Sequence, residues 1–527
     1  MIYHCEDHTC NYWDEGEKLP ERCPQCGRKL LRANEADMTG DDWTALGNTL
    51  WDAEASDKKR MVDCFRKAAY LGSAWGVCNL GICMEQGNGV EADPVQAFWL
   101  YQQAVEMGSL NAVCCLGVCY EYGIGTAPDA EKAAELYCKA AEYGSPRGQM
   151  LLAHAFHDGI GVEADAAEAV YWVRAAAYQR YGEGMHRLGV CYAYGDGVEQ
   201  NWEHAVHWFR EAAESGVSAA MTDLGYCYEK GCGVEQSWEQ AFSWYRRGAE
   251  CGYPVSMSNL GLCYKRGYGV EQNWQEAVKW YEQGAQCGNL QSMHNLACCY
   301  ERGEGVEQNM TEAIRWYTAA AEGGNTDDMY NLGWQYDHGE GVEQDMKKAI
   351  CWYERAAEQN HPAAMNSLGE CYAMGRGVPR DLETAMEWYR RAAELGEAMA
   401  DYNMGWHLEQ AGKLSEAYAH YRKAADGNDD SAWWALGRFY ENGVVVAQDG
   451  KEARRCYETG EKLGSVKCKM RLARCRLLGI GGRREKKAGL DLCRQALELA
   501  KESSEKEDYG YEAEMNLLRR TIAENES

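Results

Sequence analysis

The stretch that decides the fold is residues 218–252, SAAMTDLGYCYEKGCGVEQSWEQAFSWYRRGAECG. Ala220, Leu224 and Cys227 are spaced three and four apart, which places them on one face of a first helix, helix A. Gly231 suits the left-handed residue that ends a helix. Ser237 can then cap a second helix, helix B, whose inner face begins at Ala241. The stretch therefore predicts a helical hairpin.

The same hairpin recurs along the chain at a constant spacing. Its leading Leu returns every 36 residues at Leu80, Leu116, Leu152, Leu188, Leu224, Leu260, Leu296, Leu332 and Leu368. A Trp of helix B keeps the same period at Trp172, Trp208, Trp244, Trp280, Trp316, Trp352 and Trp388, and we expect it to pack in the core. Short hairpins bury their apolar faces only by stacking on their neighbours. The period therefore predicts an all-α fold, a right-handed α-solenoid of about 12–13 helix-turn-helix repeats of 36 residues.

These units resemble Sel-one-like repeats (SLR), relatives of the tetratricopeptide repeat. The residues that carry the resemblance are, for example, Leu188-Gly189-Val190-Cys191-Tyr192, Gly195-Asp196-Gly197-Val198, Ala205-Val206-His207-Trp208-Phe209 and Ala212-Ala213. The resemblance implies binding of protein partners, often in assembling or regulating complexes. We expect the repeats to span residues 35–482, with a last helix B and a capping helix in residues 483–527.

Residues 1–34 differ from the rest. Cys5 and Cys10 are followed by Cys23 and Cys26, two close pairs that can supply four thiolates to one metal ion. The segment looks like a zinc ribbon or a rubredoxin-like knuckle, so we expect a small metal-binding β ribbon that holds Zn²⁺ or, alternatively, Fe. Because the first pair has four residues between its cysteines, His8 could replace Cys10 as a ligand.

Composition limits the class of partner. The formal net charge of −28 repels phosphate backbones, so we expect no nucleic acid and a partner of basic character. No apolar stretch is long enough to span a membrane. With 25 cysteines and no signal segment, we expect a reducing, cytoplasmic location in which the thiols stay free.

The repeated motifs have structural explanations before chemical ones. Cys83, Cys119, Cys191, Cys227, Cys263, Cys299 and Cys371 occupy one helix A position, where Cys acts as a small buried residue. The Gly-x-Gly loops end helices and do not form a phosphate site. No Gly-x-Ser-x-Gly, His-Glu-x-x-His or Walker motif is present, so we expect no enzyme activity and no catalytic residues.

Aromatic residues at variable positions of helix A are the candidate partner-binding site. In tetratricopeptide-like stacks, the residues two before and two after the leading Leu face a concave groove. The leading position continues at Met404 and, after 32 residues, at Leu436. Counted from these and from Leu224 and Leu332, large aromatic side chains occupy the groove positions at Tyr226, Tyr330, Trp334, Tyr402, Trp406 and Trp434. Aromatic side chains are frequent anchors of bound peptides. We expect a protein-interaction scaffold; the alternative is an electron-transfer protein with iron at Cys5, Cys10, Cys23 and Cys26.

Overall fold

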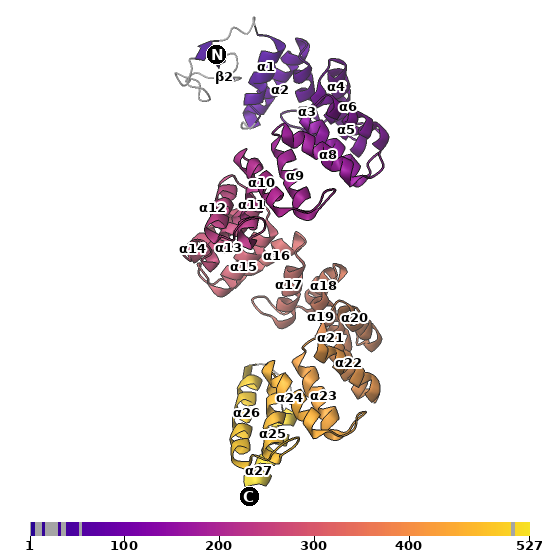
Figure 1. The fold of residues 1–527 in the computed structure, drawn as a ribbon, viewed down its shortest axis with the longest axis vertical. Coiled ribbons are helices and arrows are strands. Elements are labelled where there is room, and N and C mark those ends of the chain that lie inside the picture. Colours follow the sequence, from indigo (N-terminus) through magenta and orange to yellow (C-terminus); the bar gives the residue numbers. More distant parts are fainter. Residues whose placement is uncertain are drawn as a thin grey trace. The chain divides into compact units, whose positions relative to one another are not determined.

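A computed structural model describes residues 2–5, 13–15, 30–32, 38–51, 55–506 and 512–526. Apart from three short strands near the N-terminus, these residues form helices (Figure 1). The strands are β1 (Ile2–Cys5), β2 (Trp13–Glu15) and β3 (Leu30–Arg32). They form an antiparallel sheet in the order β2-β1-β3, in which His4 pairs with Trp13 and Cys5 pairs with Leu30.

The helices follow one another as hairpins in two compact units, Met1–Trp280 and Tyr281–Ser527. In the first unit, helices A are α1 (Gly40–Thr49), α3 (Ala74–Gln86), α5 (Leu110–Tyr122), α7 (Pro146–Asp158), α9 (Gly182–Tyr194), α11 (Ser218–Lys230) and α13 (Pro254–Arg266). Helices B are α2 (Ala55–Tyr70), α4 (Pro94–Glu106), α6 (Ala130–Glu142), α8 (Ala166–Tyr178), α10 (Trp202–Glu214) and α12 (Trp238–Glu250). The boundary between the units falls within α14 (Trp274–Gln286), a further helix B.

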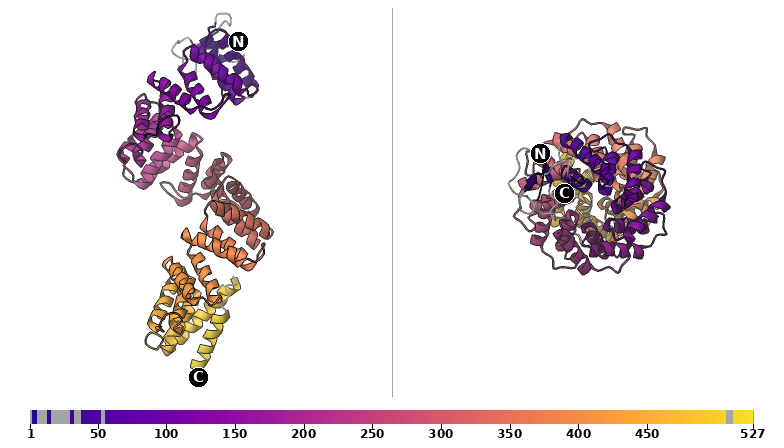
Figure 2. Two further views of the ribbon diagram at one scale, coloured as in Figure 1. Left: turned by 90° about the vertical axis from the view of Figure 1, so that its right-hand side faces the viewer. Right: turned by 90° about the horizontal axis from the view of Figure 1, so that it is seen from above.

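The second unit continues the alternation. Its helices A are α15 (Leu290–Arg302), α17 (Thr326–His338), α19 (Pro362–Met374), α21 (Ala398–Gln410), α23 (Asp430–Asn442) and α25 (Val466–Leu478). Its helices B are α16 (Met310–Glu322), α18 (Met346–Glu358), α20 (Leu382–Glu394), α22 (Leu414–Asp426), α24 (Gly450–Lys462) and α26 (Lys486–Lys506), and α27 (Glu512–Glu526) follows. Within either unit, each helix A packs on its own helix B and each helix B packs on the next helix A, from α1 to α13 and from α15 to α26 (Figure 2). The α-solenoid is confirmed, and its right-handed turn stays a prediction.

Glycine ends helix A as the sequence indicates. Gly231 follows α11 with φ of 74°, a left-handed conformation that is open to glycine at little cost. Gly233, two residues later, also has a positive φ, and a Cβ there would lie 2.3 Å from the carbonyl oxygen of Trp202. Ser237 caps α12 by accepting a hydrogen bond from the N–H of Gln240. The loop is therefore fixed both by its own backbone and by the preceding helix B.

The tryptophan series is less buried than we expected. Trp244 of α12 is half-buried, whereas the next residue, Tyr245, is 1% exposed. Successive residues on a helix point about 100° apart, so only one of two neighbours can face the core directly. Trp244 lies instead at the edge of the core, with the guanidinium of Arg247 at 4.2 Å from its ring centroid. The tryptophans therefore pack against the core as expected, but at its edge, and the tyrosine is the central aromatic residue of the repeat.

The last helix closes the apolar end of the second unit. Met515 and Leu518 of α27 join a core cluster with Met470 and Leu477 of α25. Glu514, buried among them, accepts two hydrogen bonds from the guanidinium of Arg471, each of 2.6 Å. A buried carboxylate needs such a partner, so the pair fixes how α27 docks.

Candidate functional site

A buried contact between glycine and tyrosine forms the centre of most repeats. The ring of Tyr245 on α12 lies against Gly225 on α11, where a Cβ would be 2.6 Å from ring atom Cε1. The hydroxyl of Tyr245 donates a hydrogen bond of 2.8 Å to Glu229, one turn further along α11. Equivalent hydroxyl bonds join Tyr101 to Glu85, Tyr137 to Glu121, Tyr317 to Glu301, Tyr421 to Glu409 and Tyr457 to Glu441. The aromatic ring thus fills the space between helix B and its neighbours.

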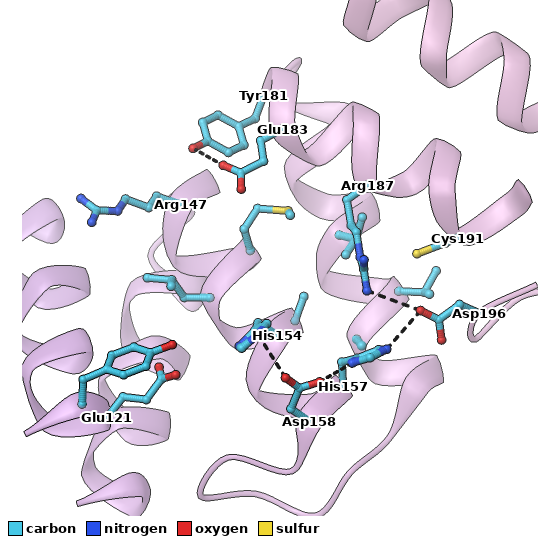
Figure 3. Close-up of a pocket in the computed structure, with 17 residues that line it drawn as sticks. Glu121, Arg147, His154, His157, Asp158, Tyr181, Glu183, Arg187, Cys191 and Asp196 are labelled. Atoms are coloured by element: carbon cyan, nitrogen blue, oxygen red, sulfur yellow. Dashed lines mark hydrogen bonds and ion pairs between the residues drawn. The ribbon is translucent and has the colours of Figure 1, made fainter. Parts of the chain in front are cut away.

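One repeat, residues 146–181, departs from this pattern at all three positions. Val173 stands in place of the tyrosine, Ala153 in place of the glycine and His157 in place of the glutamate. A pocket of about 630 Å³ lies here, with Ala153, Ala169, Val170 and Val173 among its lining residues (Figure 3). These four side chains are buried and form an apolar floor. The pocket therefore occurs where the ring that fills the other repeats is missing.

Charged side chains surround one side of the pocket. His157 hydrogen-bonds Asp158 through Nδ1, and its Nε2 lies 3.3 Å from Asp196 Oδ2. His154 Nε2 lies 3.1 Å from Asp158, and Arg187 lies 3.5 Å from Asp196 (Figure 3). The hydrogen bond from His157 lowers the pKa of Asp158. The Nδ1 and Nε2 atoms of His157 thus each lie near a carboxylate.

The other side of the pocket lies at the start of α9. The hydroxyl of Tyr181 donates a hydrogen bond of 3.2 Å to Glu183. Partial burial raises the pKa of Tyr181, and the nearby Glu183 carboxylate adds to the effect. Arg147, also lining the pocket, donates to Asn111 at 2.9 Å. An apolar floor with a polar rim suits an apolar group that carries a polar end.

The pocket is not arranged to hold a metal ion. Although His154, His157 and Asp158 lie together, no group of three or more His, Cys, Asp or Glu side chains in the described part of the chain has the arrangement of a metal site. The candidate metal ligands Cys10, Cys23 and Cys26, and the substitute His8, lie outside the described residues. Cys5 is the last residue of β1, and its side chain is not among those described.

The six aromatic residues predicted to bind a partner fall into two groups. The three aromatic residues that lie two positions after the leading residue of their repeat are exposed: Tyr226 by 44%, Trp334 by 39% and Trp406 by 38%. The ring of Trp334 stacks on His338 of the same helix, with 4.4 Å between centroids. These three side chains are accessible to another molecule.

The other three aromatic residues, which lie two positions before the leading residue of their repeat, are half-buried instead. Tyr330 stacks on His361 at 5.0 Å between centroids, and Tyr402 lies 5.6 Å from Tyr421. Trp434 lies under the guanidinium of Arg438, at 4.6 Å. Because these rings are half-buried, they offer a partner less surface than the first group.

The repeated cysteines are core residues, as the sequence indicates. Cys83, Cys227 and Cys299 are fully buried, and the other four members of the series are at most 2% exposed. Burial raises the pKa of Cys83 and of Cys227 to about 12, because a thiolate is poorly stabilised without water. These thiols stay protonated at neutral pH.

The sequence reasoning missed Val173 and Ala153. The signal was present, because an aromatic residue recurs every 36 positions at Tyr137, Phe209 and Tyr245 and is interrupted only once between them. It was not recognised because the tryptophan one residue earlier was taken as the core marker. The missing aromatic residue at Val173 indicates a pocket only once the tyrosine, and not the preceding tryptophan, is known to be the buried residue.

Comparison with protein families identifies the repeat. A family model described as Sel1 repeat matches twelve successive segments, 76–109, 112–145, 146–181, 182–217, 218–253, 254–289, 290–325, 326–361, 362–397, 398–429, 432–465 and 466–501. The chain therefore belongs to the Sel1 repeat family. The first hairpin, α1 and α2, precedes the matched segments. Proteins of this repeat class generally act as scaffolds for protein interactions.

Solved structures with the same repeat resemble the chain. A protective antigen present in uropathogenic Escherichia coli strains, which displays an SLR fold, is 29% identical, with 88% of this chain and 94% of that chain covered and a TM-score of 0.55. A Sel1 repeat protein from Oxalobacter formigenes is 31% identical, with 46% of this chain and 96% of that chain covered and a TM-score of 0.42. No curated protein matches the chain significantly. The first of these likenesses supports a repeat fold along most of the chain.

Proposed function

We propose that this chain is a scaffold that binds segments of partner proteins on the face of its helices A. The observation that carries the proposal is the exposure of Tyr226, Trp334 and Trp406, which share one position of the repeat. Large aromatic side chains that remain exposed at a common position are typical anchors for a bound peptide. We also propose that these three residues line a concave groove, as residues at this position do in tetratricopeptide-like stacks.

The second unit contains two of these exposed aromatic residues on one surface. Trp334 on α17 and Trp406 on α21 stand two repeats apart, and Glu370 on α19 has the same position between them. Because the repeats stack at constant phase, these side chains follow one line along the helices A. Glu370 and the net charge of −28 favour a partner with Lys or Arg beside its apolar residues, and disfavour nucleic acid.

The experiment changes both tryptophans to alanine. Trp334→Ala together with Trp406→Ala should weaken capture of specific partners from the native host at least tenfold, because each anchor contributes on the order of 1–2 kcal/mol. The matched control is Trp99→Ala with Tyr171→Ala, two residues on helices B that are 63% and 59% exposed. Equal recovery of the same partners by wild type and by the tryptophan variant, with circular dichroism unchanged, would refute the proposal.

We also propose that residues 1–34 bind Zn²⁺ through Cys5, Cys10, Cys23 and Cys26, with His8 as the substitute for Cys10. The pairing of Cys5 with Leu30 supports this, because the chain leaves β1 at the same end of the sheet at which it enters β3. Cys5 therefore lies at that end of the sheet, and Cys26 precedes Leu30 by four residues in the sequence. Four thiolates at such a site suit Zn²⁺ and stabilise a segment with little core of its own.

Metal analysis of the purified chain tests this proposal. We expect about one equivalent of zinc, lost in Cys23→Ser, and a colourless protein. A red protein containing iron would instead support the electron-transfer alternative, which no observation on the described residues favours.

Two findings bear on where the chain acts. No helix among the described residues has the length and apolar character needed to cross a bilayer. The cysteines of residues 38–51, 55–506 and 512–526 are all free thiols. Free thiols in such number are expected in a reducing compartment, so we propose a cytoplasmic location.

A further inference from the structure

Three side chains that the partner-binding proposal does not use converge in the second unit. His294 and Cys298 lie one turn apart on α15, and Asp328 comes from α17 of the next repeat. Cys298 Sγ lies 3.6 Å from His294 Nε2, and His294 Nδ1 lies 2.7 Å from Asp328 Oδ1. The histidine thus bridges a thiol and a carboxylate through its two ring nitrogens.

Burial of the carboxylate determines the charge on the histidine. The side chain of Asp328 is 0% exposed, and its Oδ2 accepts no hydrogen bond from the described residues. An ionised carboxylate in such a place needs a cationic partner. The hydrogen bond to Asp328 accordingly raises the pKa of His294 to about 10. His294 is therefore an imidazolium at neutral pH, and its Nε2–H points at the sulfur.

The neighbouring imidazolium of His294 affects the pKa of the Cys298 thiol. Burial by itself raises the pKa of Cys298, but the polar groups beside the sulfur, with the hydrogen bond from His294 first among them, outweigh burial and lower it. Tyr317 on α16 lies 3.3 Å from the sulfur, but it donates its single hydroxyl proton to Glu301 at 2.9 Å, so His294 is the hydrogen-bond donor to the thiolate. Glu301, the other charged group facing the sulfur, opposes ionisation.

We propose that Cys298 is a nucleophilic thiolate that His294 and Asp328 activate, and that it forms adducts with α,β-unsaturated carbonyl compounds. The sulfur forms a bond to the β carbon while the π electrons of the double bond move toward the carbonyl. The α carbon then takes the proton of the His294 imidazolium, so the adduct is neutral and no oxidant is needed. An acid placed 3.6 Å from the nucleophile suits an addition of this kind, in which a proton must be returned.

The position of Cys298 makes it available to such a compound. It is half-buried and stands two residues after Leu296, the position that Trp334 and Trp406 occupy in their repeats. Its neighbour Cys299 is fully buried, and burial is the reason the repeated cysteines stay inert. Exposed Cys287 and Cys351 are more accessible, but among the described residues no histidine hydrogen-bonds to either thiol.

The test is competitive alkylation of the full chain with N-ethylmaleimide, followed by peptide mapping that distinguishes Cys298 from Cys299. At pH 6 an ordinary thiol with a pKa of about 8.5 is roughly 0.3% ionised, so a thiol whose pKa is lowered contains more thiolate at this pH. The lower nucleophilicity of a less basic thiolate offsets only part of this gain. We therefore expect Cys298 to react faster than Cys287 at pH 6.

The pH profile separates activation from simple accessibility. The rate at Cys298 should rise less steeply between pH 6 and 8 than the rate at Cys287, because a lowered pKa leaves less thiol to ionise in this range. A Cys298 rate that is no greater than that of Cys287 at pH 6, or that rises in parallel with it, overturns the proposal.

Two variants and a matched control complete the test. His294→Asn should reduce the Cys298 rate at pH 6 at least tenfold, and Asp328→Asn should make that rate rise with pH. His186→Asn is the control, since His186 forms a similar 2.7 Å bond with Asp223 in the first unit, where Val190 takes the place of the cysteine. An unchanged Cys298 rate in Asp328→Asn, which preserves the shape of the side chain, also overturns the proposal.

Discussion

The contact between Gly225 and Tyr245 predicts that Gly225→Ala destabilises the wild-type chain but stabilises a variant that lacks the tyrosine ring. In wild type, the added Cβ of Gly225→Ala would lie 2.6 Å from Tyr245 Cε1, so the ring must move. Such overpacking costs about 1–3 kcal/mol, while replacing glycine within a helix gains about 1 kcal/mol. Ala297 and Tyr317 occupy the same two positions in another repeat, so the fold tolerates an alanine beside the tyrosine. We therefore place the overpacking cost near the middle of that range. We expect a net loss of about 1 kcal/mol.

Tyr245→Val removes the ring and reverses the result. In that background the alanine has room, so Gly225→Ala should stabilise the chain by about 1 kcal/mol, the gain in helix propensity alone. The coupling energy between the two sites is then about 2 kcal/mol. Ala153 and Val173, which occur together in the repeat that contains the pocket, form this double variant naturally.

Hydrogen exchange of the α11 and α12 amides measures both effects locally, because an array of repeats need not unfold in one step. Gly225→Ala should speed exchange about fivefold in wild type and slow it about fivefold in Tyr245→Val. If the alanine slows exchange in both backgrounds, the close approach of the tyrosine is not the reason for the glycine.

Three further predictions concern other positions. Val173→Tyr combined with Ala153→Gly should fill the pocket floor without that overpacking and raise stability by about 1 kcal/mol relative to Ala153→Gly alone, seen as a higher Tm, and a lower Tm would contradict the packing argument. Gly233→Ala should lower stability by about 2 kcal/mol more than Gly252→Ala, since both have positive φ but only the first would place its Cβ against the Trp202 carbonyl; equal thermal shifts would contradict this. Burial raises the pKa of Asp429 to about 6, so the folded chain holds an extra proton and loses stability as pH rises from about 4 to about 6. Asp429→Asn, which keeps the helix cap, should therefore have a Tm above that of wild type at pH 7.5 but not at pH 4.

Regular features of the repeat could be predicted from sequence because their causes are local. The spacing of Leu224 and Cys227 defines one face of helix A, and Gly231 ends the helix by its own backbone freedom. Tyr226, Trp334 and Trp406 were placed at accessible positions by their offset from the leading residue.

Features that depend on contacts between repeats could not be predicted in the same way. Trp244 and Tyr245 are both aromatic, and only the packing of the next helix A decides which of them is buried. Asp328 on α17 contacts His294 on α15 across 34 residues, a contact between repeats that no local sequence pattern encodes. The pocket beside Val173 depends on a missing side chain, which a search for motifs does not detect.

The docking of α27 has a consequence for any chain that lacks it. Without Glu514, Arg471 would keep a charge in a partly apolar setting, and Met470 and Leu477 would meet water. An exposed apolar surface of this kind favours association between copies. A protein shortened to residue 506 should therefore form concentration-dependent oligomers, because α27 no longer covers Met470 and Leu477.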